Sequence, residues 1–323
     1  MRHRNASVSL AALFLSLVLA AGAQAAERAK MVFGFSTIGA MAAGAWMAKE
    51  IGAFERNGID AELIYISSGP VVVQALLGGD LQAGLAATNA TIAAVLRGAQ
   101  LVSVMSTANR PYHRLFVQPE INKLEDLRGK VLGVTRFGAV TDNLTRILLK
   151  KHGLENAVSL RQLGGTMEVS AAFQHKQIAG AVTSTLRVDA QTKPKLLLKL
   201  EDMGIQYSMD VIVVSRDYLK RNAATVEAMT RAYTEGVAAM HRDKPTSLRA
   251  IARFARIADP RLIEEIYQDS VVYLEKVPRL TPEATTPILE SMGKKDVPME
   301  TFADNSIVDR LVREKFIEKL YQK

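Results

Sequence analysis

Alternating strand-like and helix-like segments constrain the fold of this chain more than any other feature of its sequence. Downstream of the N-terminal segment, short runs rich in valine, isoleucine and phenylalanine alternate with longer helical runs. The first unit predicts a strand over 31–36, a helix over 40–56 closed by Gly58, and a strand over 59–66. This order is typical of βαβ units with largely parallel strands, so the predicted fold class is α/β.

The same alternation continues along the chain. Further strands are predicted at 81–87, 101–106, 115–118, 130–135, 158–163, 180–183 and 210–215. Further helices are predicted at 71–77, 88–96 and 141–152, from 167 onward, and then at 223–241, 246–258, 260–273, 282–292 and 305–321. Because a linker over 119–127 separates the strands into two series, the second series is predicted to form another lobe.

The N-terminus has the pattern of a secretory signal peptide. A short basic head that includes Arg2 and Arg4 precedes an apolar stretch over 6–21, and Ala23-Gln24-Ala25 follows. The apolar stretch is shorter than the roughly 20 residues that a membrane span needs, and the small residues suit a signal peptidase. We therefore predict a signal peptide over 1–25 that is cut after Ala25, with an uncleaved membrane anchor as the alternative.

Cysteine is absent from the chain. Disulfides, thiolate nucleophiles, iron–sulfur clusters and cysteine zinc sites are thereby excluded. A lipid anchor is excluded as well, because it needs a cysteine at the end of the signal peptide. Together with the signal peptide, this predicts a freely soluble protein of a Gram-negative periplasm.

The mature chain of about 298 residues is too long for one compact core and suits two lobes of ordinary size. Removal of Arg2 and Arg4 with the signal peptide leaves 39 basic against 33 acidic residues, a formal charge of +6. The basic residues are scattered and aromatic residues make up only 6% of the chain, so no basic stripe with stacking side chains is present. We therefore predict no nucleic-acid partner.

Three segments resemble ABC-importer binding proteins of the nitrate/sulfonate/taurine and pyrimidine-precursor superfamily. Residues 48–63, AKEIGAFERNGIDAEL, are similar to the opening helix and second strand of that superfamily. Residues 75–84, ALLGGDLQAG, resemble its Ala-Leu-x-x-Gly-x-x-Asp-x-Gly segment, and residues 124–134, LEDLRGKVLGV, resemble its entry to the second lobe. Each segment alone is a weak signal, whereas the three together are specific.

The resemblance implies a type II periplasmic-binding-protein fold, with a central ligand cleft and a hinge between two lobes. Lobe one would comprise 27–113 plus 213–323, and lobe two would comprise 114–212. The segment 109–112 at the first crossing is expected to belong to the hinge, with the pocket wall as the alternative. Physical reasoning agrees, because ligands of open α/β sheets bind at the carboxyl ends of the strands.

The resemblance also maps ligand contacts of lobe one onto strand ends and helix N-termini. These positions are Ser36, Thr37, Ser67, Ser68, Gly69, Thr88 and Asn89. Backbone N–H groups at a helix start and short hydroxyl side chains suit an anionic group. The alternative is that these residues only cap their helices, since caps use the same residue types.

Two loops supply the corresponding candidates in lobe two. They contribute Arg136, Phe137, Gly138 and Thr141 from the first loop, and Thr183, Ser184 and Arg187 from the second. An arginine in the first loop can bind a carboxylate or sulfonate with two hydrogen bonds, so Arg136 is the predicted charge anchor, with a solvent-facing side chain as the alternative. The second loop departs from many relatives, which have a tryptophan and a Tyr/Pro pair there.

Catalysis, a metal site and a cofactor are not predicted. The five histidines are dispersed, and no zinc or calcium pattern occurs. Gly34, Gly39 and Gly44 have the wrong spacing for a dinucleotide loop. Enzymes of the wider superfamily depend on cysteine or histidine at special positions, and cysteine is absent. The chain is therefore predicted not to be an enzyme.

These inferences together predict the solute-binding subunit of an ABC importer. It would hold a small molecule between its lobes and deliver it, as a monomer, to an inner-membrane permease with its ATPase. Arg136 and the basic balance favour an organic anion such as a sulfonate or carboxylate, while pyrimidine-like and amine ligands stay open. The alternatives are a sensory protein that presents its ligand to a membrane receptor, and a periplasmic enzyme on the same fold.

Overall fold

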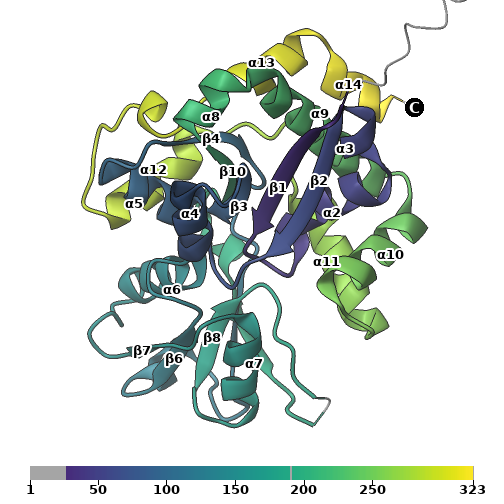
Figure 1. Ribbon diagram of the computed structural model, residues 1–323. Coiled ribbons are helices and arrows are strands. Elements are labelled where there is room, and N and C mark those ends of the chain that lie inside the picture. Colours follow the sequence, from purple (N-terminus) through teal and green to yellow (C-terminus); the bar gives the residue numbers. More distant parts are fainter. Residues whose placement is uncertain (1–26, 190, 323) are drawn as a thin grey trace, which may run out of the picture.

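The protein folds into two five-stranded sheets, each with its own helices. The computed structural model describes residues 27–189 and 191–322, so the predicted signal peptide lies outside the described residues. The first sheet has the strand order β2-β1-β3-β10-β4 and the second the order β7-β6-β8-β5-β9. In Figure 1 the first sheet lies in the upper part of the molecule and the second in the lower part, which we name lobe one and lobe two.

Lobe one combines an early run of strands with one strand from much later in the chain. Its strands are β1 (Ala29–Phe35), β2 (Ile59–Tyr65), β3 (Ala83–Ala87), β4 (Leu101–Ser106) and β10 (Asp210–Ser215). Its N-terminal helices are α2 (Ala40–Glu50), α3 (Ala53–Arg56), α4 (Gly69–Gly78) and α5 (Thr88–Leu96). β1 pairs in parallel with β2 and β3, whereas β10 lies antiparallel between β3 and β4. The start of β10 therefore lies at the same edge as the ends of β1 and β3.

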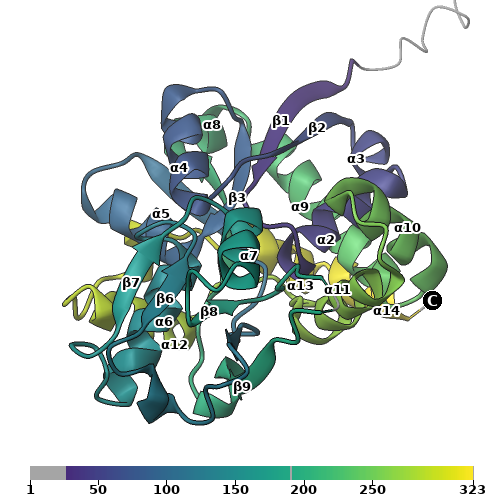
Figure 2. The ribbon, with the colours of Figure 1, turned by 90° about the horizontal axis from the view of Figure 1, so that it is seen from below.

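Lobe two is built on a smaller version of the same plan. Its strands are β5 (Arg114–Val117), β6 (Val131–Val134), β7 (Ser159–Gln162), β8 (Gly180–Thr183) and β9 (Lys195–Lys199), and its helices are α6 (Val140–Lys151) and α7 (Thr166–Gln174). β6 pairs in parallel with β7 and β8, which Figure 2 shows side by side from below. The sequence did not predict β9, because KLLLK has no alternating pattern and pairs only with β5 at the edge of the sheet.

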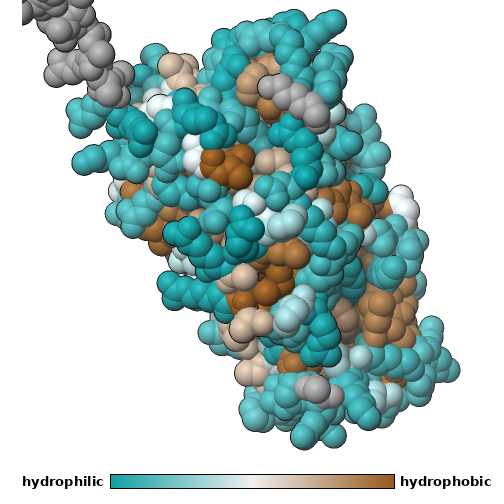
Figure 3. All heavy atoms as spheres, turned by 90° about the vertical axis from the view of Figure 1, so that its right-hand side faces the viewer, coloured by the Kyte–Doolittle hydropathy of each residue, from teal (hydrophilic) through white to brown (hydrophobic). Residues whose placement is uncertain are grey.

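The C-terminal third of the chain is helical and packs on lobe one. Its helices are α8 (Arg216–Arg221), α9 (Ala223–Met240), α10 (Lys244–Ala255), α11 (Pro260–Tyr273), α12 (Pro282–Ser291), α13 (Ser306–Arg313) and α14 (Phe316–Tyr321). α9, α10 and α11 all contact α2. On the face shown in Figure 3, apolar residues lie in separate groups among hydrophilic ones. Within the described part of the chain, no helix is long and apolar enough to cross a membrane.

Two of the predicted helices are divided. The helix expected over 40–56 stops at Gly52, whose φ of 68° separates α2 from α3. The helix expected over 305–321 is interrupted at Lys315, whose φ of 55° separates α13 from α14. A residue with positive φ cannot continue a right-handed helix, and a regular apolar pattern does not reveal such a break.

Two chain crossings join the lobes and lie side by side. The backbone N–H of Tyr207 donates to the carbonyl of Asn109 at 2.9 Å, and that of Met209 donates to the carbonyl of Ala108 at 2.9 Å. The expected boundary at 212/213 falls inside β10, because Asp210 already pairs with Ala87 in the first sheet. We propose that lobe two ends before Asp210 and that the paired crossings form the hinge.

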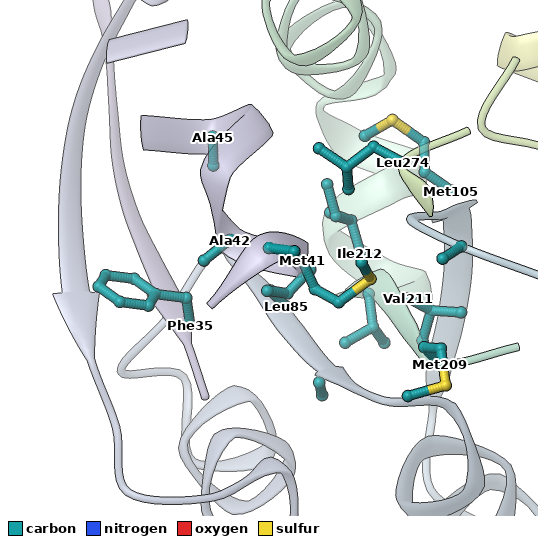
Figure 4. Close-up of a cluster of buried hydrophobic side chains, with 14 of the residues drawn as sticks. Phe35, Met41, Ala42, Ala45, Leu85, Met105, Met209, Val211, Ile212 and Leu274 are labelled. Atoms are coloured by element: carbon teal, nitrogen blue, oxygen red, sulfur yellow. The ribbon is translucent and has the colours of Figure 1, made fainter. Parts of the chain in front are cut away.

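The core of lobe one is built around α2, whose residues 40–48 are all buried. Figure 4 shows Met41 of α2 among Leu85 of β3 and Val211 and Ile212 of β10. Trp46 of the same helix is fully buried, and its ring meets that of Phe35 edge to face at 5.7 Å. This packing holds the N-terminal end of α2 against the sheet edge where β1 and β3 end.

A pair of glycines brings α2 and α9 into backbone contact. A Cβ atom at Gly236 of α9 would lie 2.3 Å from the carbonyl oxygen of Gly44 and 2.6 Å from the backbone nitrogen of Ala48. A Cβ at Gly44 would lie 2.8 Å from Val237. Only glycine permits this approach, so the two helices cross as closely as their backbones allow.

Candidate functional site

A cleft lies between the lobes, at the strand ends that face one another in Figure 1. Ala87 at the end of β3 and Asp210 at the start of β10 line it from lobe one, and Thr183 at the end of β8 lines it from lobe two. The other lining residues are Ser36, Thr37, Ser67, Ser68, Gly69, Tyr112, His113, Thr135, Ala139, Val140, Thr141, Thr166 and Ser184. The enclosed space is about 40 Å³, which admits only a few water molecules. The lobes must therefore part before a solute can enter.

The predicted ligand contacts divide into two groups. The residues that line the cleft are Ser36, Thr37, Ser67, Ser68, Gly69, Thr141, Thr183 and Ser184. The residues outside its lining are Thr88, Asn89, Arg136, Phe137, Gly138 and Arg187. Most of the predicted strand-end and helix-start positions thus line the cleft, whereas Thr88, Asn89 and the two arginines do not. That the first group contacts a solute remains a proposal.

Ser68 and Gly69 place the N-terminus of α4 at the cleft. Ser68 occupies the N-cap position, yet its side chain makes no capping hydrogen bond. Its Oγ is buried and has no hydrogen-bond partner among the described residues. A Cβ at Gly69 would lie 2.8 Å from the backbone nitrogen of Ala87, so only glycine lets α4 approach β3 this closely. The hydroxyl of Ser68 is therefore available to a solute.

Three hydroxyl groups from separate elements meet at one side of the cleft. The position of a Cβ at Gly39 would lie 3.6 Å from Ser184 Oγ, 3.6 Å from Thr37 Oγ1 and 3.9 Å from Tyr112 Oη. Burial, together with the negative field of Asp210, raises the pKa of Tyr112 well above its usual range. The phenol therefore stays protonated and can donate or accept a hydrogen bond, as the other two hydroxyls can.

Asp210 is the acidic residue of the cleft lining. It is 3% exposed, and no described residue forms a hydrogen bond or ion pair with its carboxyl group. Burial raises its pKa to about 7 because a charged carboxylate is poorly solvated there. Sequence reasoning missed this residue, although an acid at the start of an otherwise apolar strand, DVIVVS, was a usable signal.

His113 adds an uncharged ring to the cleft. It is 4% exposed, and burial, followed by the nearby Arg114 guanidinium, lowers its pKa to about 3. The ring is therefore neutral over the physiological range, and its Nδ1 has no hydrogen-bond partner among the described residues. Asp210 is consequently not balanced by a histidinium ion across the cleft.

Arg114 holds the wall of the cleft in place rather than lining it. Its Nη1 and Nη2 donate to the two carboxylate oxygens of Asp269 on α11 at 2.9 and 2.6 Å. Nη1 also donates to the backbone carbonyl of Ser184 at 3.2 Å. The arginine thus joins β5, α11 and the loop after β8, and its charge is neutralised by Asp269 rather than by a solute.

Thr88 and Asn89 make structural contacts instead of lining the cleft. Ala87 holds the N-cap position of α5, so neither residue caps the helix. The hydroxyl of Thr88 shares a 2.8 Å hydrogen bond with Ser208 of the second crossing. Nδ2 of Asn89 donates to the carbonyl of Gly138 in lobe two at 2.8 Å. Asn89 therefore fastens one lobe to the other in this closed arrangement.

The loop that contains the predicted charge anchor borders the cleft at both of its ends, whereas Arg136, Phe137 and Gly138 lie outside the lining. Phe137 is 51% exposed and, with Gly138, borders a separate outer groove between α4 and α5. Arg136 lines neither the cleft nor that groove, and its Nε has no hydrogen-bond partner among the described residues. Arg136 Nε is buried, so the side chain is not fully turned to solvent. That Arg136 anchors the charge of a solute stays a prediction.

Arg187 also lies beyond the lining residues. Its Nη1 approaches the sulfur of Met167 at 3.6 Å, and its backbone N–H donates to Ser170 Oγ at 3.0 Å. Burial lowers the pKa of its guanidinium, and Tyr65 of lobe one opposes that change. The residue packs on α7, outside the cleft lining, and its Nε and Nη2 are buried without a hydrogen-bond partner among the described residues. That Arg187 contacts a solute stays a prediction.

The family model described as NMT1/THI5 like matches residues 40–246 of this chain. A protein of Brucella abortus that is named as a binding protein is 24% identical over 245 residues, which cover 74% of this chain and 76% of that protein. A solved structure from Bordetella bronchiseptica has a TM-score of 0.76 at 18% identity, over 90% of this chain and 98% of the other. The alkanesulfonate-binding protein SsuA from Xanthomonas axonopodis, solved with bound MOPS, has a TM-score of 0.68 at 18% identity, over 88% and 98%. These likenesses confirm the predicted two-lobed type II binding-protein fold.

Proposed function

Because the chain belongs to the NMT1/THI5-like family, we propose that it is the periplasmic solute-binding subunit of an ABC importer. The observation that carries the proposal is the cleft at the junction of two sheets, lined by polar groups from both lobes. Closure of the lobes would enclose a small solute, which the protein would pass to an inner-membrane permease with its ATPase. The names of the Brucella and Xanthomonas proteins support a binding role.

In this proposal the protein acts as a monomer, performs no chemistry on its solute and reaches the periplasm through the signal peptide over 1–25. The residues of the cleft bind, orient and enclose the solute. The paired crossings supply the hinge, and the contact between Asn89 and Gly138 holds the closed form. Release would follow when the permease favours the open form.

The organic anion expected from the sequence is not part of the proposed function. That expectation rested on the basic balance of the chain and on Arg136, which lies outside the lining of the cleft. The charged group that does line the cleft is a carboxyl, and a buried carboxylate repels an anion. The proposal is therefore limited to a small polar molecule.

The proposal is tested by thermal shift on residues 26–323 after partial unfolding and dialysis to remove carried-through ligand. The panel contains sulfonates, carboxylates, nitrate, bicarbonate, pyrimidines and amines. A ligand at 100 times its Kd stabilises the protein by about 2.7 kcal/mol, which raises the midpoint by roughly 5 °C. One responding class, recovered chemically intact, supports a binding protein. Turnover of the responding compound would instead establish an enzyme.

Ser184→Tyr is expected to abolish that shift of roughly 5 °C. Ser184 lines a space of about 40 Å³, and a phenol ring there excludes a solute and holds the lobes apart. The matched control is Ser159→Tyr, on the exposed edge strand β7 and outside the cleft lining, which should keep the full shift. A Ser184→Tyr protein that still responds to the same ligand would show that solutes bind elsewhere.

A further inference from the structure

The carboxyl group of Asp210 is placed as a binding group and has no structural partner. It begins β10 at the cleft edge of the first sheet, opposite Ala87, and is 3% exposed. No described residue donates a hydrogen bond to it, and none of the ion pairs of the described residues includes it. Buried acids are normally paired, because burial of a carboxylate without a partner is unfavourable. Its missing partner is therefore expected to come from the solute.

Positive charge is absent from the described lining of the cleft. The lining contains no lysine or arginine, and burial keeps His113 neutral. Arg114, which follows His113 in the chain, already binds both carboxylate oxygens of Asp269. Arg136 and Arg187 lie beyond the lining. The protein itself thus leaves the charge of Asp210 uncompensated.

A region of partial positive charge is formed at the cleft by helices of lobe two and by α4 of lobe one. The helices α4, α6 and α7 each bring residues of their N-terminal ends to the lining, and such ends carry partial positive charge. The buried, unpartnered Oγ of Ser68 stands at the N-cap of α4. This region suits oxygen atoms of a solute, which leaves Asp210 to receive its nitrogen.

We propose that the solute carries a protonated nitrogen whose N–H groups bind the carboxylate of Asp210. This inference rests on the proposed solute-binding function and narrows its ligand to amines or amidines, with any oxygen atoms of the solute turned toward Ser68 and the helix N-termini. A charge-assisted N–H···O⁻ pair in a closed cleft is stronger than a neutral hydrogen bond. It also satisfies a carboxylate that would otherwise be buried without a partner.

The test compares matched probes on the unmodified protein by calorimetry at pH 8. Each pair consists of a small amine or amino acid and the same carbon skeleton without the nitrogen, such as 3-aminopropanoate and propanoate. Pairs with two to six carbons are used, up to 10 mM. The nitrogen member of at least one pair should bind, and its partner without nitrogen should bind at least about 30-fold more weakly. The proposal is overturned if every nitrogen compound fails to bind or if the pairs bind equally.

Two variants then assign the contact. Asp210→Asn, which keeps the size of the side chain, should weaken the nitrogen ligand at least about 30-fold. Arg136→Ala, outside the cleft, should leave it within about twofold. Circular dichroism verifies that both variants fold. Unchanged binding to Asp210→Asn overturns the assignment.

The outcomes also separate this inference from the proposed function. If a nitrogen-free anion binds the wild type and Arg136→Ala abolishes that binding, the protein is still a solute-binding protein but its ligand class is the anion. If no compound of any class binds, the proposed function itself fails. The same calorimetric series therefore distinguishes a wrong ligand class from a wrong proposed function.

Discussion

Asp210→Asn is expected to make the ligand-free protein more stable than the wild type at pH 8, by an amount that disappears near pH 4. Burial raises the pKa of Asp210 from its ordinary value of 3.8 to about 7. Below pH 4 the carboxyl is protonated in both the folded and unfolded states and contributes nothing to the pH dependence. Between these values the folded state holds a proton that the unfolded state has lost, so stability falls as the pH rises. Above pH 7 the penalty is complete, about 2 to 4 kcal/mol.

The groups around Asp210 do not obscure this effect. The tyrosines that feel its field, Tyr112, Tyr207 and Tyr233, all have pKa values raised above their ordinary value by burial, so they stay protonated. His113, whose pKa is about 3, stays neutral above pH 4. Urea denaturation of the wild type and Asp210→Asn at pH 4.5, 6 and 8 measures the difference. A difference that is constant across this range would contradict a buried, unpartnered carboxyl.

Asp126→Asn provides a control of opposite sign. Asp126 is half-buried near the surface, and the backbone N–H groups of Asn122 and Lys123 hold its pKa below the ordinary value. Its ionised form therefore stabilises the folded state, and that contribution is lost as the pH falls through the folded-state pKa. The variant should lose stability at pH 6 and above, which distinguishes a site-specific effect from a general change in net charge.

Gly236→Ala should lower the free energy of unfolding by about 3 kcal/mol or more, and the thermal midpoint by roughly 6 to 12 °C. The added Cβ would meet the carbonyl oxygen of Gly44 at 2.3 Å and the backbone nitrogen of Ala48 at 2.6 Å. Both are backbone atoms, which cannot rotate away, so α2 and α9 must separate. The loss occurs although alanine favours a helix over glycine by about 1 kcal/mol.

The matched control for this substitution is Gly78→Ala at the end of α4. Gly78 is helical and exposed, and its nearest contact to a new Cβ is the side chain of Asp80 at 3.4 Å. The control should be neutral or slightly stabilising, because it gains helix propensity without a clash. Thermal denaturation of both variants measures the contrast. A Gly236→Ala protein as stable as the control would show that the helices tolerate a wider crossing.

Most of the fold could be predicted from the spacing of apolar residues and from the glycine, proline and capping residues that end helices and strands. Strands 101–106, 180–183 and 210–215 and the helix over 260–273 have the predicted bounds. The failures occur where a local conformation overrides the pattern. A positive φ at Gly52 divides one long apolar helix, and β9 forms only because β5 offers an edge to pair with.

The sequence predicted where the cleft lies, but it did not predict which charged residue lines the cleft. Several short hydroxyl residues after strands line the cleft, because parallel strands end at one edge of a sheet and helices start there. Arg136 was singled out for its chemistry, yet the direction of a long side chain depends on the loop that carries it. Asp210 escaped notice because the strand that bears it runs antiparallel, so its cleft residue comes first in the strand rather than last.

The paired crossings have a mechanical consequence. Asp210 directly follows the segment in which Tyr207 and Met209 are bonded to Asn109 and Ala108. Atoms near a hinge axis move least when the lobes open or close. A solute bound to Asp210 would therefore keep this contact throughout closure, whereas its contacts with Thr141 and Thr166 of lobe two would form last. Binding would then begin next to the hinge and extend outward across the cleft. The outer edges of the lobes, which move farthest on closure, would present the change in shape by which a membrane partner distinguishes the loaded protein from the empty one.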